Sequence, residues 1–199
     1  AIMHGGQKLK ERSGQWVTVP ALIGLVSTSS GRVGLNIVRV TKDGYKAGDF
    51  MAGEIERITG IKPEDVKSKQ LLRSQPKMRG GAVRFGNAKD VWCVGEGLET
   101  MLAVSLGTGS VSVAACGTGA LLRSVDIPEQ VEKVNIFADK DRNKAGLNAA
   151  EGLKDRRISK GLEVEILMPG GDIPDGAKGV DWCDQYSMFG KGSFLNGAI

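Results

Sequence analysis

The chain has 199 residues, of which 41% are hydrophobic and 25% are charged. This length and composition are typical of a soluble globular protein that can bury a core without disulfide or metal staples. No signal peptide is visible and no apolar run is long enough to cross a membrane, so we expect no membrane partner. The net charge of +4 and the pI of about 9.0 permit a polyanionic partner without requiring one.

The N-terminal part predicts a hairpin and short helices. Residues 1–15 are polar and basic, and the β-rich runs 17–26 and 33–40 flank the turn-forming sequence STSSGR. These runs predict an antiparallel hairpin, followed by a turn in TKDGYKAG. Two helical patterns fall within residues 51–75. The segment MRGGAVRFG then predicts a turn or a close approach of backbone to a ligand.

The C-terminal part alternates strand and helix. Four apolar runs, DVWCVGEG, VSVAACGTG, KVNIFAD and LEVEILMP, are separated by three helical patterns, LETMLAVSLG, ALLRSV and KAGLNAAEGLKDRRISKG. The first three runs do not alternate, as expected for buried parallel strands. We therefore expect an α/β domain with a parallel sheet at residues 89–199, preceded by a basic mixed α+β subdomain with an antiparallel hairpin at residues 1–88.

Cysteine usage indicates a reducing compartment. Cys93, Cys116 and Cys183 are too scattered for a metal-binding knuckle, and an odd number of cysteines is typical of the cytosol. Cys93 and Cys116 lie in apolar runs, where we expect small core residues.

Three carboxylates follow the ends of predicted strands. Glu96 lies between two glycines after the first strand, and Asp139 and Asp141 follow the third. Functional groups of open α/β sheets gather beyond the carboxyl ends of the strands, so these residues are expected at one edge. Such a cluster is costly unless cations compensate it, and hard oxygen ligands suit Mg²⁺ or Mn²⁺. Helix capping by Asp139 or Asp141 remains an equal alternative for each residue taken singly.

A basic stretch precedes the α/β part. From Arg73 to Lys89, both included, there are five basic residues and no acidic one. A phosphate-facing surface and a solvated basic loop explain this pattern equally well.

At these residues the chain resembles the Toprim family, which includes bacterial-type DNA primases, topoisomerases, nucleases and recombination mediators. The resemblance rests on VGEGLETMLA and FADKDRNKAGLNAA, supported by ACGTGAL, GVDWCDQY, RGGAVRFG and PALIGLV…GRVGLNIVRV. It covers about residues 15–186 and is strongest to primases of phages and plasmids. Val180 and Cys183 depart from the family pattern, which usually has Lys and Asn at these positions.

The resemblance implies a Toprim-type sheet and the catalytic core of a phage- or plasmid-type DNA primase. Such an enzyme joins ribonucleoside triphosphates into short RNA primers on a single-stranded DNA template, in the bacterial host cytoplasm. A replicative helicase, separate or fused, is the implied protein partner. Mg²⁺ or Mn²⁺ would be held by Glu96, Asp139 and Asp141, with Glu96 either a pure ligand or a general base.

Further site residues are implied less directly. Asp184 and Asp181 are possible additional metal ligands, although Asp181 is equally expected to form a turn. Template or triphosphate binding is assigned to Arg79 and Arg84, with weaker candidates Lys77, Arg73 and Arg39. Two other residues are expected to be structural: Glu99 interacts with a helix dipole, and Trp182 packs in the core.

Two other functions use the same residues. A Toprim nuclease would cleave DNA with these acids and without added nucleotides. A non-catalytic nucleic-acid-binding module would keep its function when Asp139 and Asp141 are replaced by alanine.

Overall fold

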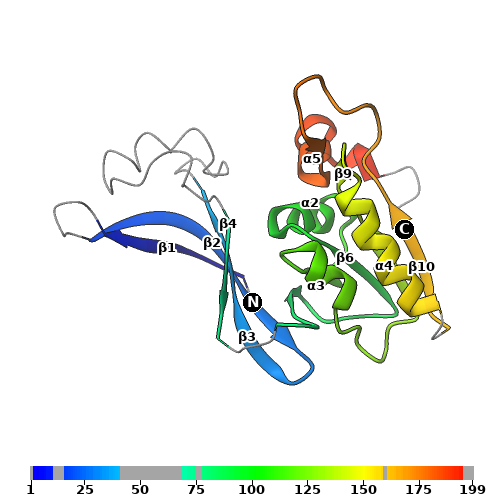
Figure 1. Cartoon of the computed structure of the whole chain (residues 1–199), viewed down its shortest axis with the longest axis horizontal. Helices are drawn as coiled ribbons and strands as arrows, with labels where there is room; N and C mark the ends of the chain where they lie inside the picture. Colours follow the sequence, from blue (N-terminus) through cyan, green and yellow to red (C-terminus); the bar gives the residue numbers. More distant parts are fainter. Residues whose placement is uncertain (1, 11–15, 41–68, 75–77, 159–160, 195–199) are drawn as a thin grey trace.

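The structure, a computed structural model, describes residues 2–10, 16–40, 69–74, 78–158 and 161–194 (Figure 1). Its elements in chain order are β1 (Ile2–Lys10), β2 (Trp16–Thr28), β3 (Gly31–Arg39), β4 (Lys69–Arg73), β5 (Ala82–Phe85), β6 (Val91–Gly95), α2 (Leu98–Thr108), β7 (Val113–Ala115), α3 (Gly119–Ser124), β8 (Lys133–Phe137), β9 (Lys140–Asp141), α4 (Ala145–Ile158), β10 (Glu163–Leu167), β11 (Gly179–Val180), α5 (Trp182–Phe189) and the 3₁₀ helix η2 (Gly190–Phe194). Within these described ranges, no helix is both long and apolar enough to cross a membrane.

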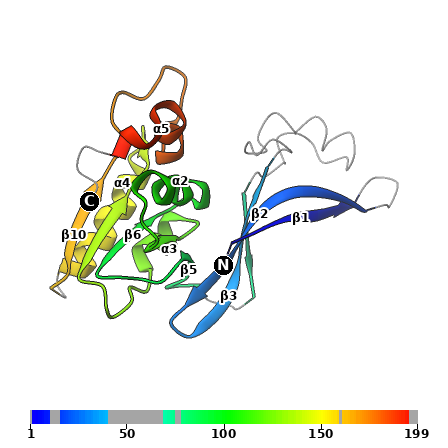
Figure 2. The ribbon, with the colours of Figure 1, turned by 180° about the vertical axis from the view of Figure 1, so that it is seen from behind.

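The C-terminal part is built on a four-stranded parallel sheet in the order β10-β8-β6-β7. These are the four strands that the sequence predicts, and the α/β expectation is confirmed. The chain adds β7 on one side of β6 and then adds β8 and β10 on the other side. With right-handed crossovers, this change of side places α2 on one face of the sheet and α3 and α4 on the opposite face. Helix α5 packs against α2, and α3 packs against α4, so each face carries a helix pair (Figures 1 and 2).

The N-terminal part is antiparallel and continues the same sheet. Strand β5 pairs with β7 on one side and with β2 on the other, and β3 and β4 extend the sheet beyond β2. Strand β1 also pairs with β2, which completes a nine-stranded sheet. The predicted β2–β3 hairpin is confirmed. The proposed domain boundary near residue 88 falls in the connection between β5 and β6.

Five of the described strands were not expected from the sequence, and two of them, β9 and β11, form a separate two-stranded antiparallel sheet. Strand β1 lies in the polar N-terminal segment, and β5 lies in the stretch interpreted as a turn or as a close approach of backbone to a ligand. Strand β4 occupies Lys69–Arg73, where the helical interpretation is wrong because these residues pair with β3. The rest of the two helices expected within residues 51–75, and the turn expected at residues 41–48, lie outside the described residues.

The core lies between the sheet and its helices. Trp92, Phe137, Leu98 and Met101 are among the largest fully buried side chains. Cys93 and Cys116 are buried, as expected, and burial raises the pKa of both thiols.

An aromatic cluster holds the C-terminal helices against the end of β8. Trp182 makes an edge-to-face contact with Phe137, with ring centroids 5.2 Å apart, and stacks on Phe194 at 5.1 Å. Trp182 is only 5% exposed, so the prediction that it packs in the core is confirmed. This packing fixes the start of α5, which lies next to the functional edge described below.

Candidate active site at the acid edge

The carboxylates that follow β6 and β8 emerge at one edge of the parallel sheet. Gly95 pairs in register with Phe137, so Glu96, one residue beyond β6, and Asp139, two residues beyond β8, lie at the same end of two neighbouring strands. Strand β9 then carries Asp141. We call the set Glu96, Asp139 and Asp141 the acid edge.

Small residues let the backbone and two helices approach this edge closely. A Cβ at Gly95 would lie 2.7 Å from the Phe137 carbonyl oxygen, and one at Gly119 would lie 3.3 Å from Oε2 of Glu96. A Cβ at Gly146 would lie 3.0 Å from the Asp139 nitrogen and closer still to its carbonyl oxygen. Helices α3 and α4 therefore begin directly against the acid edge. At Gly146, where the contacted atoms belong to the backbone, the approach requires glycine.

Asp139 is the most perturbed carboxylate of the acid edge. Burial, together with the nearby negative charges of Asp181, Glu96 and Asp141, raises its pKa to about 7. Its buried Oδ1 has no hydrogen-bond partner among the described residues. A buried carboxylate oxygen without a partner is costly, so this atom is suited to bind a cation or a donor from a ligand.

Glu96 and Asp141 differ in their surroundings. Burial raises the pKa of Glu96; Lys69 opposes this, whereas Asp141 and Glu99 add to it. Oδ2 of Asp141 accepts a 2.9 Å hydrogen bond from the Gly146 amide in the first turn of α4. Asp141 therefore does cap α4, one of the two roles that the sequence left open for it. The hydrogen bond from Gly146 uses Oδ2 and does not engage Oδ1.

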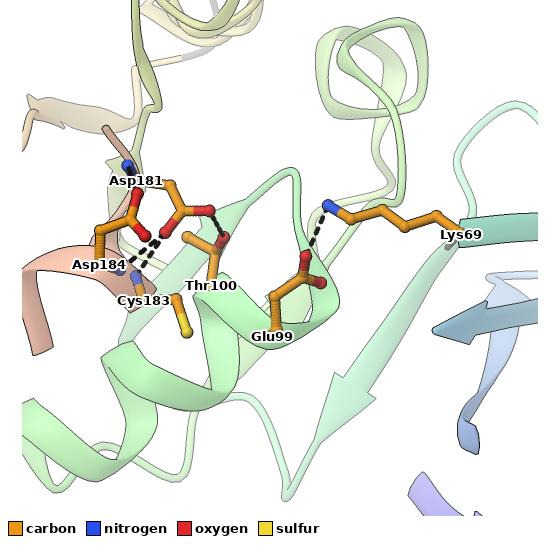
Figure 3. Close-up of polar contacts among 6 residues, drawn as sticks. All are labelled: Lys69, Glu99, Thr100, Asp181, Cys183 and Asp184. Atoms are coloured by element: carbon orange, nitrogen blue, oxygen red, sulfur yellow. Dashed lines mark hydrogen bonds and ion pairs between the residues drawn. The ribbon is translucent and has the colours of Figure 1, made fainter. Parts of the chain in front are cut away.

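A lysine from the N-terminal part lies close enough to the acid edge to affect the pKa values of Glu96 and Asp139, and Figure 3 shows it pointing toward Glu99. Nζ of Lys69, on β4, lies 2.6 Å from Oε1 of Glu99, whose side chain is 16% exposed. Burial alone would lower the pKa of Lys69, but Glu99, Asp139 and Asp181 together raise it. Glu99 lies in the first turn of α2, as expected for a helix-dipole contact, and this ion pair is an additional partner.

Asp181 and Asp184 form the N-terminal cap of α5 (Figure 3). Oδ1 of Asp181 accepts hydrogen bonds from the amides of Cys183 and Asp184, and Oδ2 of Asp184 accepts one from the Asp181 amide. This reciprocal arrangement is a capping box. Oδ2 of Asp181 also accepts a 3.4 Å hydrogen bond from Thr100. Asp181 is close enough to raise the pKa of Asp139, whereas Asp184 is exposed and engaged in the cap.

The predicted basic residues have different environments. The guanidinium of Arg84 donates to the backbone oxygens of Ser27 and Asp126, so it holds β5 to the chain around it. Arg39 is buried and donates to Oε1 of Gln70 at 3.0 Å. Arg73 and Arg79 are exposed, and Lys77 lies outside the described residues. Of the four candidates that the structure describes, Arg73 and Arg79 are the ones that present their side chains to solvent.

The chemistry of the acid edge fits a divalent cation. All the candidate donors are carboxylate oxygens, one of them buried without a partner. Burial and the nearby negative charges raise the pKa values of Glu96 and Asp139, and a bound cation would relieve this repulsion. Among the described residues, no three acidic, histidine or cysteine side chains are already grouped to ligate one ion. A cation held by all three carboxylates would therefore require these side chains to come closer together.

Comparisons with known proteins identify the family. The Toprim domain pattern matches residues 91–192, just over half of the chain, so the chain belongs to the Toprim domain family. Its fold is similar to that of the DnaG primase catalytic domain bound to ssDNA, with a TM-score of 0.52, 15% identity, and coverage of 87% of this chain and 49% of that chain. The fold is also similar to that of the DnaG catalytic core, with a TM-score of 0.51, 16% identity, and coverage of 87% of this chain and 50% of that chain.

The chain thus spans about half the length of these two structures, and at such low identity the likeness shows the fold alone. A search of curated proteins by sequence found no match.

The ion pair between Lys69 and Glu99, near the acid edge, could not be found from the sequence. Lys69 and Glu99 are thirty residues apart, and nothing in the sequence indicates that β4 brings them together. The capping role of Asp181 and Asp184, by contrast, has a visible signal, because an acceptor followed three residues later by an acid before a helix is a capping-box pattern.

Proposed function

We propose that the chain is the catalytic core of a DNA primase, which joins ribonucleoside triphosphates on single-stranded DNA with Mg²⁺ or Mn²⁺. The observation that carries this proposal is the gathering of Glu96 and Asp139 at one edge of a Toprim sheet. The antiparallel N-terminal part adds support, because the likeness to the DnaG catalytic core covers 87% of the chain and so extends beyond the Toprim domain.

The reaction requires a ribose 3′-hydroxyl to attack the α-phosphorus of an incoming triphosphate. The new P–O bond forms as the bond to pyrophosphate breaks, and the hydroxyl proton passes to a base. Glu96, Asp139 and Asp141 would hold the divalent cation, which stabilises negative charge on the attacking and leaving oxygens. Glu96 is the candidate base; a ligand role is equally compatible with its position.

The remaining residues have supporting roles in this proposal. Lys69 limits the repulsion among the carboxylates, since it lowers the pKa values of both Glu96 and Asp139. Arg79 and Arg73 would contact template or triphosphate from the N-terminal part. Asp181 would orient the start of α5 beside Asp139 and is a weaker candidate ligand. The biological setting that best fits the sequence resemblance is phage or plasmid replication with a helicase partner.

Primer synthesis tests the proposal directly. The purified chain is mixed with single-stranded DNA, labelled ribonucleotides and Mg²⁺ or Mn²⁺, beside an Asp139→Asn variant. The matched control is Asp155→Asn, which removes an exposed carboxylate on α4. We expect short labelled RNA from the wild type and the control but not from Asp139→Asn. Degradation of the DNA without RNA synthesis would instead indicate a Toprim nuclease, and intact DNA without product would contradict catalysis by this chain.

A further inference from the structure

A small cavity lies at the opposite end of the parallel sheet from the acid edge. It has a volume of about 260 Å³ and lies where α2 ends, with Thr108 and Gly109 in its wall. Val91 and Lys133, the first residues of β6 and β8, also line it, whereas the acid edge follows the last residues of these strands. We call it the Asn135 cavity. No residue of the catalytic proposal is among its described lining residues.

Asn135 carries an unpaired polar atom in this cavity. It lies in the middle of β8, is 2% exposed and belongs to the lining. Its Oδ1 is buried and has no hydrogen-bond partner among the described residues. A buried acceptor without a partner destabilises the folded chain, whereas an apolar side chain of the same shape would not. The unpaired oxygen therefore points to a ligand that supplies the donor.

The register of the sheet directs the Asn135 side chain toward the cavity. Asn135 is paired with Cys93 of β6, and the side chains of paired residues lie on the same face of a sheet. Cys93 also lines the cavity, as do Val91 and Lys133, which lie two residues earlier on the two strands and so share that face. Asn135 and these three residues thus form one continuous wall.

Two serine hydroxyls in the wall supply hydrogen-bond donors. Oγ of Ser110 accepts a 3.2 Å hydrogen bond from the Ser112 amide, and Oγ of Ser112 accepts one of 2.9 Å from the Lys89 amide. Neither hydroxyl donates its own hydrogen to another of the described residues, so both can donate to a ligand. Oγ of Ser110 lies 3.9 Å from Sγ of Cys93, the strand neighbour of Asn135, so a donor and the unpaired acceptor flank the same residue.

The charges around the cavity favour an uncharged ligand. The ammonium group of Lys133 is paired with Glu163 at 2.9 Å and with Glu165 at 3.1 Å. The other lysine of the lining, Lys89, is followed directly by Asp90, which also belongs to the lining. The described lining residues therefore present no excess of positive charge that would attract an anion.

The apolar part of the wall suits a flat ring. Val91 and Val111 are 38% and 54% exposed, and a ligand in the cavity would remove this apolar surface from water. The volume is below the about 300 Å³ at which ligand pockets usually begin, so the ligand must be small. An asparagine carboxamide pairs with adenine by accepting from the N6 amino group and donating to N7.

We propose that the Asn135 cavity binds free adenine or adenosine, with the N6 amino group donating to Oδ1 of Asn135. Ser110 and Ser112 would donate to the remaining acceptors of the ligand, and Val91 and Val111 would cover part of its ring. This site is separate from the acid edge, because Asn135 and Asp139 are four residues, or about 13 Å of extended strand, apart. The inference goes beyond the proposed function and does not depend on it.

Calorimetric titration of the full chain with adenosine tests this inference. EDTA is present and adenosine carries no phosphate, so metal-dependent binding at the acid edge does not contribute. Inosine, in which an oxygen replaces the N6 amino group, is the matched control ligand. The test variant is Asn135→Leu, which keeps the side-chain shape, and the control variant is Asn148→Leu, which makes the same change at an exposed position of α4. Ser110→Ala is measured as a second variant of the cavity.

We expect wild type and Asn148→Leu to bind adenosine with the same Kd, and Asn135→Leu to bind it at least roughly tenfold more weakly. Wild type should bind inosine at least roughly tenfold more weakly than adenosine, because the inosine oxygen would face the unpaired Oδ1, and Asn135→Leu should lose this preference. The Tm of Asn135→Leu should equal or exceed that of wild type, since the substitution removes an unpaired buried acceptor.

Three results would overturn the inference. Wild type that does not bind adenosine, or binds adenosine and inosine equally, would contradict recognition of the amino group. Equal adenosine affinity in wild type and Asn135→Leu would place the ligand elsewhere. A Tm of Asn135→Leu well below that of Asn148→Leu would show that the Asn135 amide is needed by the fold itself. If Asn135→Leu does not fold, adenosine binding by Ser110→Ala that is as tight as in wild type overturns the inference, and binding weakened severalfold supports it.

Discussion

Gly146→Ala should impair the acid edge without altering any charged group. Gly146 lies in the first turn of α4, and its amide donates to Asp141. An added Cβ would be 3.0 Å from the Asp139 nitrogen, 3.1 Å from its carbonyl carbon and closer to its carbonyl oxygen, whereas ordinary contact begins at 3.4 Å. These neighbours are backbone atoms that cannot rotate away. Asp139 or α4 must therefore move by about 0.4 Å or more, judged from the nitrogen contact alone.

Two opposing effects set the magnitude for stability. Overpacking costs about 1–3 kcal/mol, and replacing glycine by alanine in a helix returns about 0.5–1 kcal/mol, so we expect a net loss of about 0–2.5 kcal/mol in unfolding free energy. Misplacement of a catalytic group by 1 Å costs about a hundredfold in rate, so we expect primer synthesis to fall roughly tenfold to a hundredfold.

Urea unfolding and the primer assay check the two effects, with Gly192→Ala in η2 as the control because its added Cβ would meet nothing within 4 Å. A Gly146→Ala protein that is more stable than wild type and fully active would refute this reasoning.

Three further changes test the surroundings of the site. Lys69→Met should lower the unfolding free energy by about 1 kcal/mol, because solvent only partly screens the attraction between the partly exposed Lys69 and Glu99. A double-mutant cycle with Glu99→Gln that shows no coupling energy between the two residues would contradict this. Asp184→Ala removes half of the capping box and should lower Tm by about 2–4 °C, corresponding to about 1 kcal/mol; an unchanged Tm in calorimetry would show that the cap is dispensable. Phe194→Ala should cost about 3–5 kcal/mol in urea unfolding, because the ring stacks on Trp182 in the core; a loss below about 1 kcal/mol would contradict that packing.

The parallel sheet was predictable because its strands are self-evident in the sequence. Strands β6, β7 and β8 are buried on both faces, so they appear as short apolar runs bounded by glycine or acid. The unexpected strands lack this property. Strand β1 contains adjacent glycines and several polar residues, and β4 is half exposed, so their pairing with β2 and β3 rather than local composition defines them.

Site residues were predictable from the sequence only where the order of the strands in the sheet is enough to determine their position. Glu96 and Asp139 follow parallel neighbours, so a correct sheet brings them together without knowledge of side-chain packing. The environment of Arg84 could not be inferred, because its bonds to Ser27 and Asp126 depend on how β5 meets β2 and the end of α3. The pair of Lys69 with Glu99 likewise depends on the placement of an edge strand. Sequence thus predicts groups at strand ends and misses those set by contacts between distant elements.

The central claim is that the acid edge holds a divalent cation for phosphoryl transfer. Titration of Mn²⁺ into the purified chain, followed by electron paramagnetic resonance of the free ion, tests it most directly. The wild type and Asp155→Asn are predicted to bind Mn²⁺ with the same affinity, while Glu96→Gln with Asp139→Asn should bind at least roughly tenfold more weakly, since two of the carboxylate ligands are lost. Equal Mn²⁺ affinity in all three proteins would contradict the account.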